Sequence, residues 1–167
     1  MATILVVDDN DELRTLIGEV LELAGHTVRF AVDGLDGLHA LDKAFPQLVV
    51  SDIDMPVLSG PAMILRMFVE NLGRENIPVI VVSSASNLAH VAATMGTPYH
   101  LPKPFTADAL LEVVARALDE GRPPRPPSLE LRQDVRAAPA VHRPRRFRRR
   151  SLGHGRRATR RLLPRGP

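Results

Sequence analysis

Acidic side chains directly follow two short apolar runs of this sequence, and a lysine follows a third. Asp8 and Asp9 come after Ile-Leu-Val-Val, and Asp52 comes after Leu-Val-Val-Ser. Lys103 lies within Leu-Pro-Lys-Pro-Phe. Carboxylates brought to about 4 Å repel by about 4 kcal/mol per pair at an effective dielectric constant of about 20, and a lysine and a divalent cation relieve that repulsion. These residue types therefore indicate a site for a phosphoryl group and a hard cation.

The apolar runs are typical of buried parallel strands, because amphipathic helical patterns separate them. Such an alternation with right-handed crossovers forms a doubly wound α/β domain. In these sheets the chemistry lies just beyond the carboxyl ends of the strands, so the three aspartates and Lys103 are expected to meet at one edge. We predict strands at residues 3–7, 27–31, 48–52, 79–83 and 99–101, helices at residues 10–23, 33–44, 60–72 and 87–95, and a last helix capped by Thr106 and ended by Gly121.

Two of these helices have apolar residues at helical spacing, which predicts the face that packs on the sheet. In the helix at residues 10–23, the predicted inner residues are Leu13, Leu16, Ile17, Val20 and Ala24. In the helix at residues 33–44, they are Leu35, Leu38, Leu41 and Phe45.

Length and composition limit the class of protein. The chain has 167 residues and no cysteine, which allows one domain of ordinary size and excludes a disulfide framework or a thiolate metal site. Its first residues begin a strand and not a secretory signal. No apolar stretch approaches the roughly 20 residues that span a bilayer. We therefore expect a soluble, cytoplasmic protein without a membrane partner.

The charge of the chain is divided between two parts. Residues 1–121 carry 7 basic and 17 acidic side chains, giving −10, whereas residues 122–167 carry 15 basic and 2 acidic ones, giving +13. We expect the domain to end at Gly121. The Pro/Arg-rich tail at residues 122–167 lacks the apolar surface needed to offset the entropy of ordering, so we expect it to be disordered apart from a short helix at residues 129–138.

An arginine-rich segment at residues 145–150 is the part of the tail with a functional interpretation. Five arginines surround one phenylalanine there. Such a segment can bind nucleic acid or an acidic surface, including the acidic domain that precedes it. A linker remnant or a C-terminus translated in a shifted frame explains the same composition, and we favour these two interpretations over specific nucleic-acid binding.

The acidic pair, Asp52, a hydroxyl residue at the end of the fourth strand and Lys103-Pro104 together resemble the receiver domain of two-component response regulators, of which the chemotaxis regulator is the simplest relative. The resemblance covers residues 1–120. The segment Asp-Ile-Asp-Met-Pro-Val-Leu-Ser-Gly at residues 52–60 is similar to the loop that follows the phosphoacceptor in that family. The resemblance implies a flavodoxin-like fold with five parallel strands in the order 2-1-3-4-5.

The resemblance also implies the roles of the acidic residues. Asp52 would be the nucleophile that accepts a phosphoryl group from a phosphohistidine on a partner kinase. Asp9 would bind Mg²⁺ directly, and Asp8 would act through water. Asp52 and the backbone carbonyl of Asp54 would complete the protein ligands, in keeping with the preference of Mg²⁺ for few carboxylates and phosphate oxygens.

Other positions of the family pattern are matched or altered. Lys103 would bind the phosphoryl oxygens, and the Lys103–Pro104 peptide bond is cis in the family. Ser83 would donate to a phosphoryl oxygen and move inward, although nearby serines leave its register open and serine is also a common turn residue. His100 stands where the family usually has a Tyr or Phe switch ring. Asp54 adds an acid near the acceptor, and we hypothesise that it alters the hydrolysis rate of the phosphoaspartate.

The expected output is a change in a protein-binding surface formed by the helix at residues 87–95, the fifth strand and the last helix. Nothing after residue 121 is long or apolar enough for a DNA-binding helix-turn-helix unit. We therefore predict a stand-alone receiver that acts by protein contact or as a phosphorelay intermediate. Its expected partners are a sensor histidine kinase or phosphotransfer protein, a downstream protein target and a second receiver in a homodimer. We expect no enzymatic activity beyond acceptance and hydrolysis of its own phosphoryl group.

Three other classes match parts of the pattern. A phosphatase of the haloacid dehalogenase type carries Asp-x-Asp after a strand, as Asp52-Ile53-Asp54 does, but its acidic metal pair follows the nucleophile, whereas Asp8 and Asp9 precede it. A Rossmann domain would have a glycine-rich loop where Asp8 and Asp9 stand. A pseudo-receiver that serves only as an interaction module would lack the acceptor.

Overall fold

The structure, a computed structural model, describes residues 1–70 and 73–126 and contains one parallel sheet. The strands follow the order β2-β1-β3-β4-β5, which confirms the predicted doubly wound fold. All five strands begin where the sequence predicts, and the last is one residue longer than expected. Their bounds are β1 (Thr3–Val7), β2 (Thr27–Ala31), β3 (Leu48–Asp52), β4 (Val79–Ser83) and β5 (Tyr99–Pro102).

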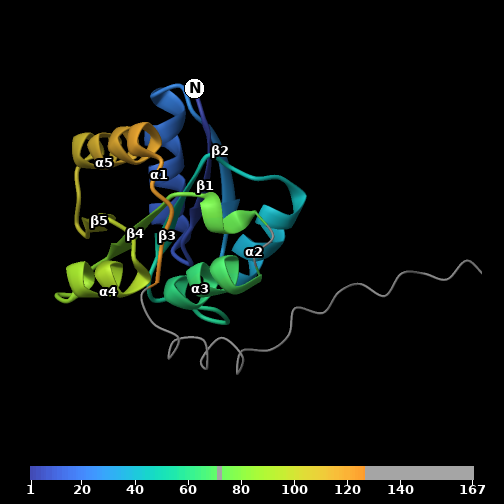
Figure 1. Ribbon diagram of the computed structural model, residues 1–167. Helices are drawn as coiled ribbons and strands as arrows, with labels where there is room; N and C mark the ends of the chain where they lie inside the picture. Colours follow the sequence, from blue (N-terminus) through green and yellow to red (C-terminus); the bar gives the residue numbers. More distant parts are fainter. Residues whose placement is uncertain (71–72, 127–167) are drawn as a thin grey trace, which may run out of the picture.

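Helices cover both faces of the sheet, with α1 and α5 on one face and α2, α3 and α4 on the other (Figure 1). Side chains cap two of the helices. The side chain of Asp33 accepts from the amides of Leu35 and Asp36, and that of Thr106, the predicted cap, accepts from the amide of Ala109. The bounds are α1 (Asp11–Leu23), α2 (Gly34–Lys43), α3 (Gly60–Glu70), α4 (Leu88–Met95) and α5 (Ala107–Glu120), with a short 3₁₀ turn, η1, at Arg74–Asn76.

The central strands are apolar on both sides because each of their faces meets a helical layer. Along β1, Leu5 and Val7 enter the core beneath α2, α3 and α4, whereas Ile4 and Val6 enter the core beneath α1 and α5. All four side chains are fully buried. This alternation holds β1 rigidly in place, and with it the acidic residues that follow.

Two predicted helix faces need correction. Leu16 is 54% exposed, and the buried residues of α1 are Ile17, Gly18 and Leu21. Leu16 lies about 100° around the helix from Ile17, outside the buried stripe; Ala24, beyond the end of α1, is also exposed. Phe45 is 53% exposed because α2 ends at Lys43, and the extended backbone at Ala44 takes the chain off the helical period.

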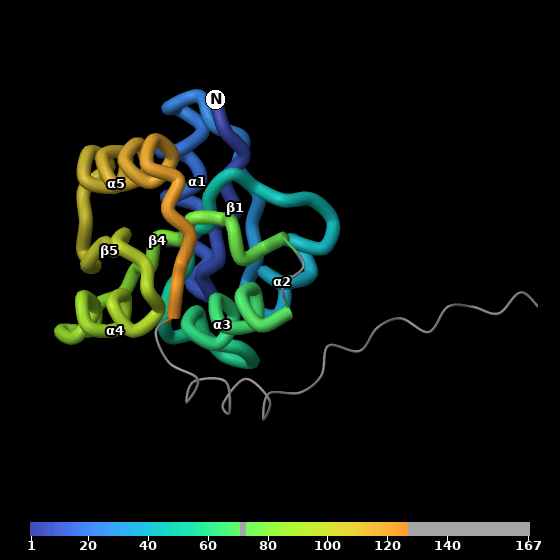
Figure 2. Tube along the Cα trace, in the orientation of Figure 1, coloured from blue at the N-terminus to red at the C-terminus, as the bar shows by residue number. Residues whose placement is uncertain are grey.

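The chain continues to pack on the domain after Gly121, the predicted boundary. Residues 122–126 run back from the end of α5 to the end of α4 (Figure 2). The remainder of the predicted tail, including the helix expected at residues 129–138 and the arginine-rich segment at 145–150, lies outside the described residues. None of the helices in the described ranges is long and apolar enough to cross a membrane.

The corrected face of α1 can be tested with one substitution at two positions. Leu21→Ala is expected to lower the free energy of unfolding by about 2 to 5 kcal/mol, because it opens a cavity in the core. Leu16→Ala is expected to cost less than about 1 kcal/mol, because most of that side chain is already in water. Urea unfolding followed by circular dichroism measures both. Equal losses at the two positions would contradict the orientation of α1 described here.

Candidate functional site

The sheet register brings the predicted site residues to one edge. Strands β1 and β3 pair in parallel with Val7 opposite Ser51, so Asp8 and Asp52 follow side by side. Strand β4 lies next to β3, with Val82 opposite Asp52. Strand β5 lies beyond it, with Pro102 opposite Ser83. The carboxyl ends of four neighbouring strands thus deliver two carboxylates, a hydroxyl and the residue before Lys103 to one place.

Lys103 joins the two buried carboxylates. Its Nζ donates to Asp52 Oδ1 at 2.7 Å and to Asp8 Oδ2 at 3.0 Å. Asp8 and Asp52 are only 2% and 7% exposed, so hydrogen bonds from this ammonium group replace bonds to water that the carboxylates lose on burial. The Lys103 amide donates to the carbonyl oxygen of Ser83 at 2.9 Å, and the following peptide bond to Pro104 is cis, as the resemblance implies.

Backbone amides also donate to both carboxylates, and a side chain holds the backbone of Asp8. The Asp54 amide donates to Asp52 Oδ2 at 3.0 Å, and the Asn10 amide donates to Asp8 Oδ1 at 2.9 Å. Arg14, one turn into α1, donates from Nη1 to the carbonyl oxygen of Asp8 at 2.7 Å. Arg14 is not among the predicted site residues, and its position six residues after Asp8 in the first turn of the helix is the available signal.

Gly60 is required for the loop that carries Asp52 into α3. Its amide donates to the carbonyl oxygen of Ile53 at 3.0 Å, which draws the start of α3 against the end of β3. A Cβ atom at this position would overlap the backbone carbonyl of Asp52. Only glycine therefore allows this approach of helix and strand.

The electrostatics of the pair follow from burial and proximity. Burial raises the pKa of Asp52, the neighbouring charge of Asp8 raises it further, and the bonds from Lys103 and the Asp54 amide offset this only in part. For Lys103, burial alone would lower the pKa, but the bonds and charges of Asp52 and Asp8 together outweigh it and raise the pKa. The lysine thus stays charged, while Asp52 is a more basic carboxylate than an exposed aspartate.

The remaining predicted residues lie around this pair. Ser83 is buried at the end of β4, and its Oγ accepts from the Ala85 amide at 3.0 Å. Asp9 and Asp54 are exposed at the edge of the site, and His100 is exposed on β5. Across residues 1–70 and 73–126, no three His, Cys, Asp or Glu side chains are close enough together to share a metal ion. The donors themselves are carboxylate and carbonyl oxygens, which suit Mg²⁺.

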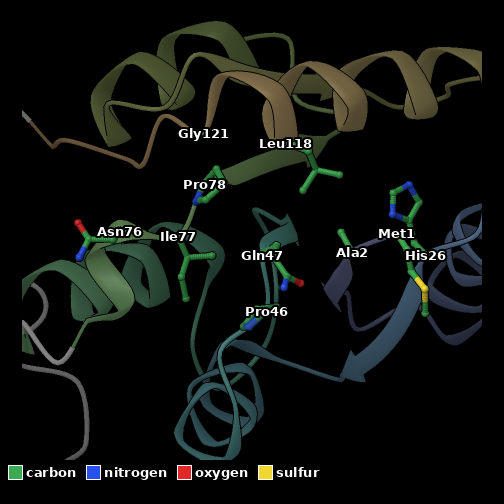
Figure 3. A pocket seen from close by; sticks show the side chains of 10 residues that line it. All are labelled: Met1, Ala2, His26, Pro46, Gln47, Asn76, Ile77, Pro78, Leu118 and Gly121. Carbon is green, nitrogen blue, oxygen red and sulfur yellow. The ribbon is translucent and has the colours of Figure 1, made fainter.

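A hollow lies at the opposite edge of the sheet from the Lys103 site (Figure 3). Its lining includes Gln47 and Pro78, which directly precede β3 and β4, and Leu118 from α5. Because β3 ends at Asp52, this hollow is a full strand length away from the carboxylates. It is therefore separate from the site.

Comparison with known proteins identifies the family. The profile described as the response regulator receiver domain matches residues 4–115. The chain belongs to this family. Receiver domains typically accept a phosphoryl group without acting as enzymes on a separate substrate, and they typically use Mg²⁺. The protein is thus a response regulator of two-component signal transduction, and neither the phosphatase nor the nucleic-acid-binding alternative is favoured.

Related proteins match the receiver over most of its described part. Sporulation initiation phosphotransferase F of Bacillus subtilis is 32% identical over 117 residues, which cover 69% of this chain and 92% of that protein. The DNA-binding transcriptional regulator NtrC of Azospirillum brasilense is 34% identical over 125 residues, which cover 74% of this chain and 25% of NtrC. The receiver chain therefore spans about a quarter of the length of the larger transcriptional regulators that it matches.

Solved receiver structures show the same arrangement. The receiver domain of NtrX from Brucella abortus has 33% identity and a TM-score of 0.63, with coverage of 70% of this chain and 98% of that one. The chemotaxis protein CheY4 of Vibrio cholerae has 28% identity and a TM-score of 0.61, with coverage of 70% and 98%.

The ion pair predicts a pH-dependent loss of stability in Lys103→Met. Without the ammonium group, the pKa of Asp52 in the folded state rises further above its unfolded value, so the ionised site destabilises the fold. We expect a loss of about 3 to 5 kcal/mol at pH 8, which shrinks as the pH falls through the folded pKa and Asp52 becomes protonated. Urea titrations at pH 5 and pH 8 measure it.

Lys43→Met is the matched control, because Lys43 is the other lysine of the chain and is exposed at the end of α2. It should change stability little at either pH. A loss in Lys103→Met that is the same at pH 5 and pH 8 would argue against the charge balance described above.

Proposed function

We propose that the receiver accepts a phosphoryl group on Asp52 from a phosphohistidine of a sensor kinase or phosphotransfer protein. The observation that carries this proposal is the pair of bonds from Lys103 Nζ to Asp52 Oδ1 and Asp8 Oδ2, two buried carboxylates at the strand ends. These bonds align one carboxylate and concentrate positive charge beside it, which are the two things that phosphoryl transfer needs from a protein.

The chemistry at Asp52 is a displacement at phosphorus. A carboxylate oxygen of Asp52 attacks the phosphorus atom, the bond from phosphorus to the donor imidazole breaks, and the imidazole leaves with the electron pair. The product is a mixed anhydride, which water later hydrolyses to restore the carboxylate. Burial supports this role because it raises the pKa of Asp52 and makes its carboxylate a better nucleophile. Lys103 stays charged and balances the phosphoryl oxygens.

Mg²⁺ is the cofactor that we propose for this step. Asp8, Asp9, Asp52 and the backbone carbonyl of Asp54 would hold it, and when bound it would supply positive charge to the phosphoryl oxygens. Asp8 and Asp52 are adjacent through Lys103, and Asp9 follows Asp8 in the chain with an exposed side chain that can turn toward them. In this proposal Lys103 and the ion together balance the negative charge of the acidic side chains.

The signal would leave through α4, β5 and α5. Ser83 is buried beside Asp52, and we propose that its hydroxyl turns to donate to the phosphoryl oxygens, which draws in the loop before α4. His100, exposed on β5, is the proposed second switch residue. The surface altered in this way would bind a downstream protein or a second receiver. We propose the cytoplasm as the compartment and the receiver, residues 1–121, as the unit that undergoes phosphorylation.

The acceptor can be tested with a small-molecule donor. The protein incubated with Mg²⁺ and acetyl phosphate is expected to gain one base-labile phosphoryl group, measured by intact-protein mass spectrometry. Asp52→Asn is expected to abolish this gain, because the amide that replaces the carboxylate is a poor nucleophile. Asp54→Asn, two residues away and exposed, is the matched control and should still be modified. Equal modification of Asp52→Asn and the parent protein would exclude Asp52 as the acceptor.

The same control variant tests the role proposed for Asp54. If the Asp54 carboxylate orients the water that hydrolyses the anhydride, Asp54→Asn should lengthen the half-life of the phosphoryl group by up to about 100-fold, the lower end of the contribution of a positioned general base. The half-life is followed by mass after the donor is removed. An unchanged half-life would dismiss this role and leave Asp52 as acceptor.

A further inference from the structure

Residues 122–126, with the sequence Arg-Pro-Pro-Arg-Pro, form a strap across the domain. The strap starts after α5 and crosses to the C-terminal end of α4, where Figures 1 and 2 draw it in orange. The Arg122 amide donates to Tyr99 Oη at 3.3 Å, and the Arg125 amide donates to the Gly96 carbonyl oxygen at 3.1 Å. Pro124, between these two bonds, is buried. The strap is therefore a packed part of the receiver.

Tyr99 anchors one end of the strap. Its side chain is fully buried at the start of β5, and its hydroxyl donates to Glu120 Oε2 at 3.2 Å while it accepts from the Arg122 amide. Arg122 Nε also pairs with Glu120 Oε2 at 3.3 Å. The guanidinium of Arg116 lies 5.6 Å from the centre of the Tyr99 ring, within cation–π range. These contacts tie the strap to both β5 and α5.

Gly96 anchors the other end. It caps α4 with a left-handed backbone, at a φ of 68°, which favours glycine. Space gives a second reason for glycine, because a Cβ atom there would overlap the backbone of Arg125. Gly25, which follows α1 with a φ of 86°, has no atom within 4 Å of such a Cβ. The two glycines therefore share the backbone constraint, and only Gly96 is in contact with the strap.

The strap is linked to the acceptor site by a short rigid path. Strand β5 runs from Tyr99 to Pro102, and the next residue is Lys103, which bonds to Asp52. Helix α4, which ends at Gly96, directly precedes this strand. Both anchors of the strap thus belong to the elements through which the phosphorylated site would signal. In the arrangement in which Lys103 bonds directly to the Asp52 carboxylate, the strap is docked.

We propose that the strap is an autoinhibitory clamp, which holds α4 and β5 in the arrangement of the unmodified Asp52 carboxylate and loosens when Asp52 carries a phosphoryl group. This inference rests on the proposed phosphorylation of Asp52. Because coupling between two sites is reciprocal, a receiver with a weakened strap binds a phosphoryl group or its mimic more tightly.

The clamp is tested in the full-length protein with Mg²⁺ and beryllofluoride, which mimics a phosphoryl group on a carboxylate. Gly96→Ala is expected to bind the mimic at least about fivefold more tightly than the parent, the lower end of typical coupling between sites. Gly25→Ala carries the same backbone penalty without touching the strap, so its affinity should equal that of the parent. Pro124→Asp, which puts a charge into the buried part of the strap, should act like Gly96→Ala.

Amide hydrogen exchange in the parent protein provides the direct readout. Exchange at Arg122 and Arg125 is expected to speed up when the mimic binds, and Asp52→Asn should abolish this response. Binding of the mimic with unchanged exchange at these two amides, or with equal affinity in Gly96→Ala and the parent, would overturn the clamp and leave the proposed function intact. Failure of every variant to bind the mimic would overturn the proposed function and the clamp with it.

Discussion

The ammonium group of Lys103 bonds to two buried carboxylates at once, and the arrangement of the site depends on this interaction. Asp8 and Asp52 are both buried, and they could not both stay ionised without a cation, because each loses most of its hydration. A single cation leaves one negative charge of the two carboxylates uncompensated, and burial keeps the pKa of Asp52 raised despite the lysine. A negatively charged site that remains partly uncompensated is suited to take up further positive charge together with a phosphoryl group.

The site requires Asp8, Asp52 and Lys103, from three separate parts of the chain, to meet within hydrogen-bonding distance. Parallel strands accomplish this, since their carboxyl ends converge at one edge while their side chains enter two cores. At Gly60 the start of α3 lies close against the end of β3. The loop between them supplies the Asp54 amide, which donates to Asp52. The framework is rigid along the strands, and Ser83, whose hydroxyl is proposed to move, is the last residue of β4.

Much of this arrangement can be predicted from sequence, and the exceptions have physical causes. The runs that end at Asp8 and Asp52 predict their strands because both faces of a central strand are buried. Leu16 and Phe45 are wrongly predicted to be buried. The sequence alone does not distinguish an apolar residue in a buried stripe from one that flanks the stripe or follows the end of the helix. The strap is missed because an Arg/Pro composition favours disorder. One backbone–backbone bond, one bond from a backbone amide to the Tyr99 hydroxyl and one buried proline are nevertheless enough to fix five residues. The roles of Asp8, Asp9, Asp52, Ser83, His100 and Lys103 stay predictions.

The contacts around Tyr99 have a practical consequence. The chain contains one tyrosine and no tryptophan, so its tyrosine fluorescence originates from a single ring. That ring touches the carboxylate of Glu120, the guanidinium of Arg116 and the backbone amide of Arg122. Its emission therefore depends on how the end of α5, the start of β5 and the following segment fit together. The molecule carries an intrinsic optical reporter at the junction between its folded body and its C-terminal extension.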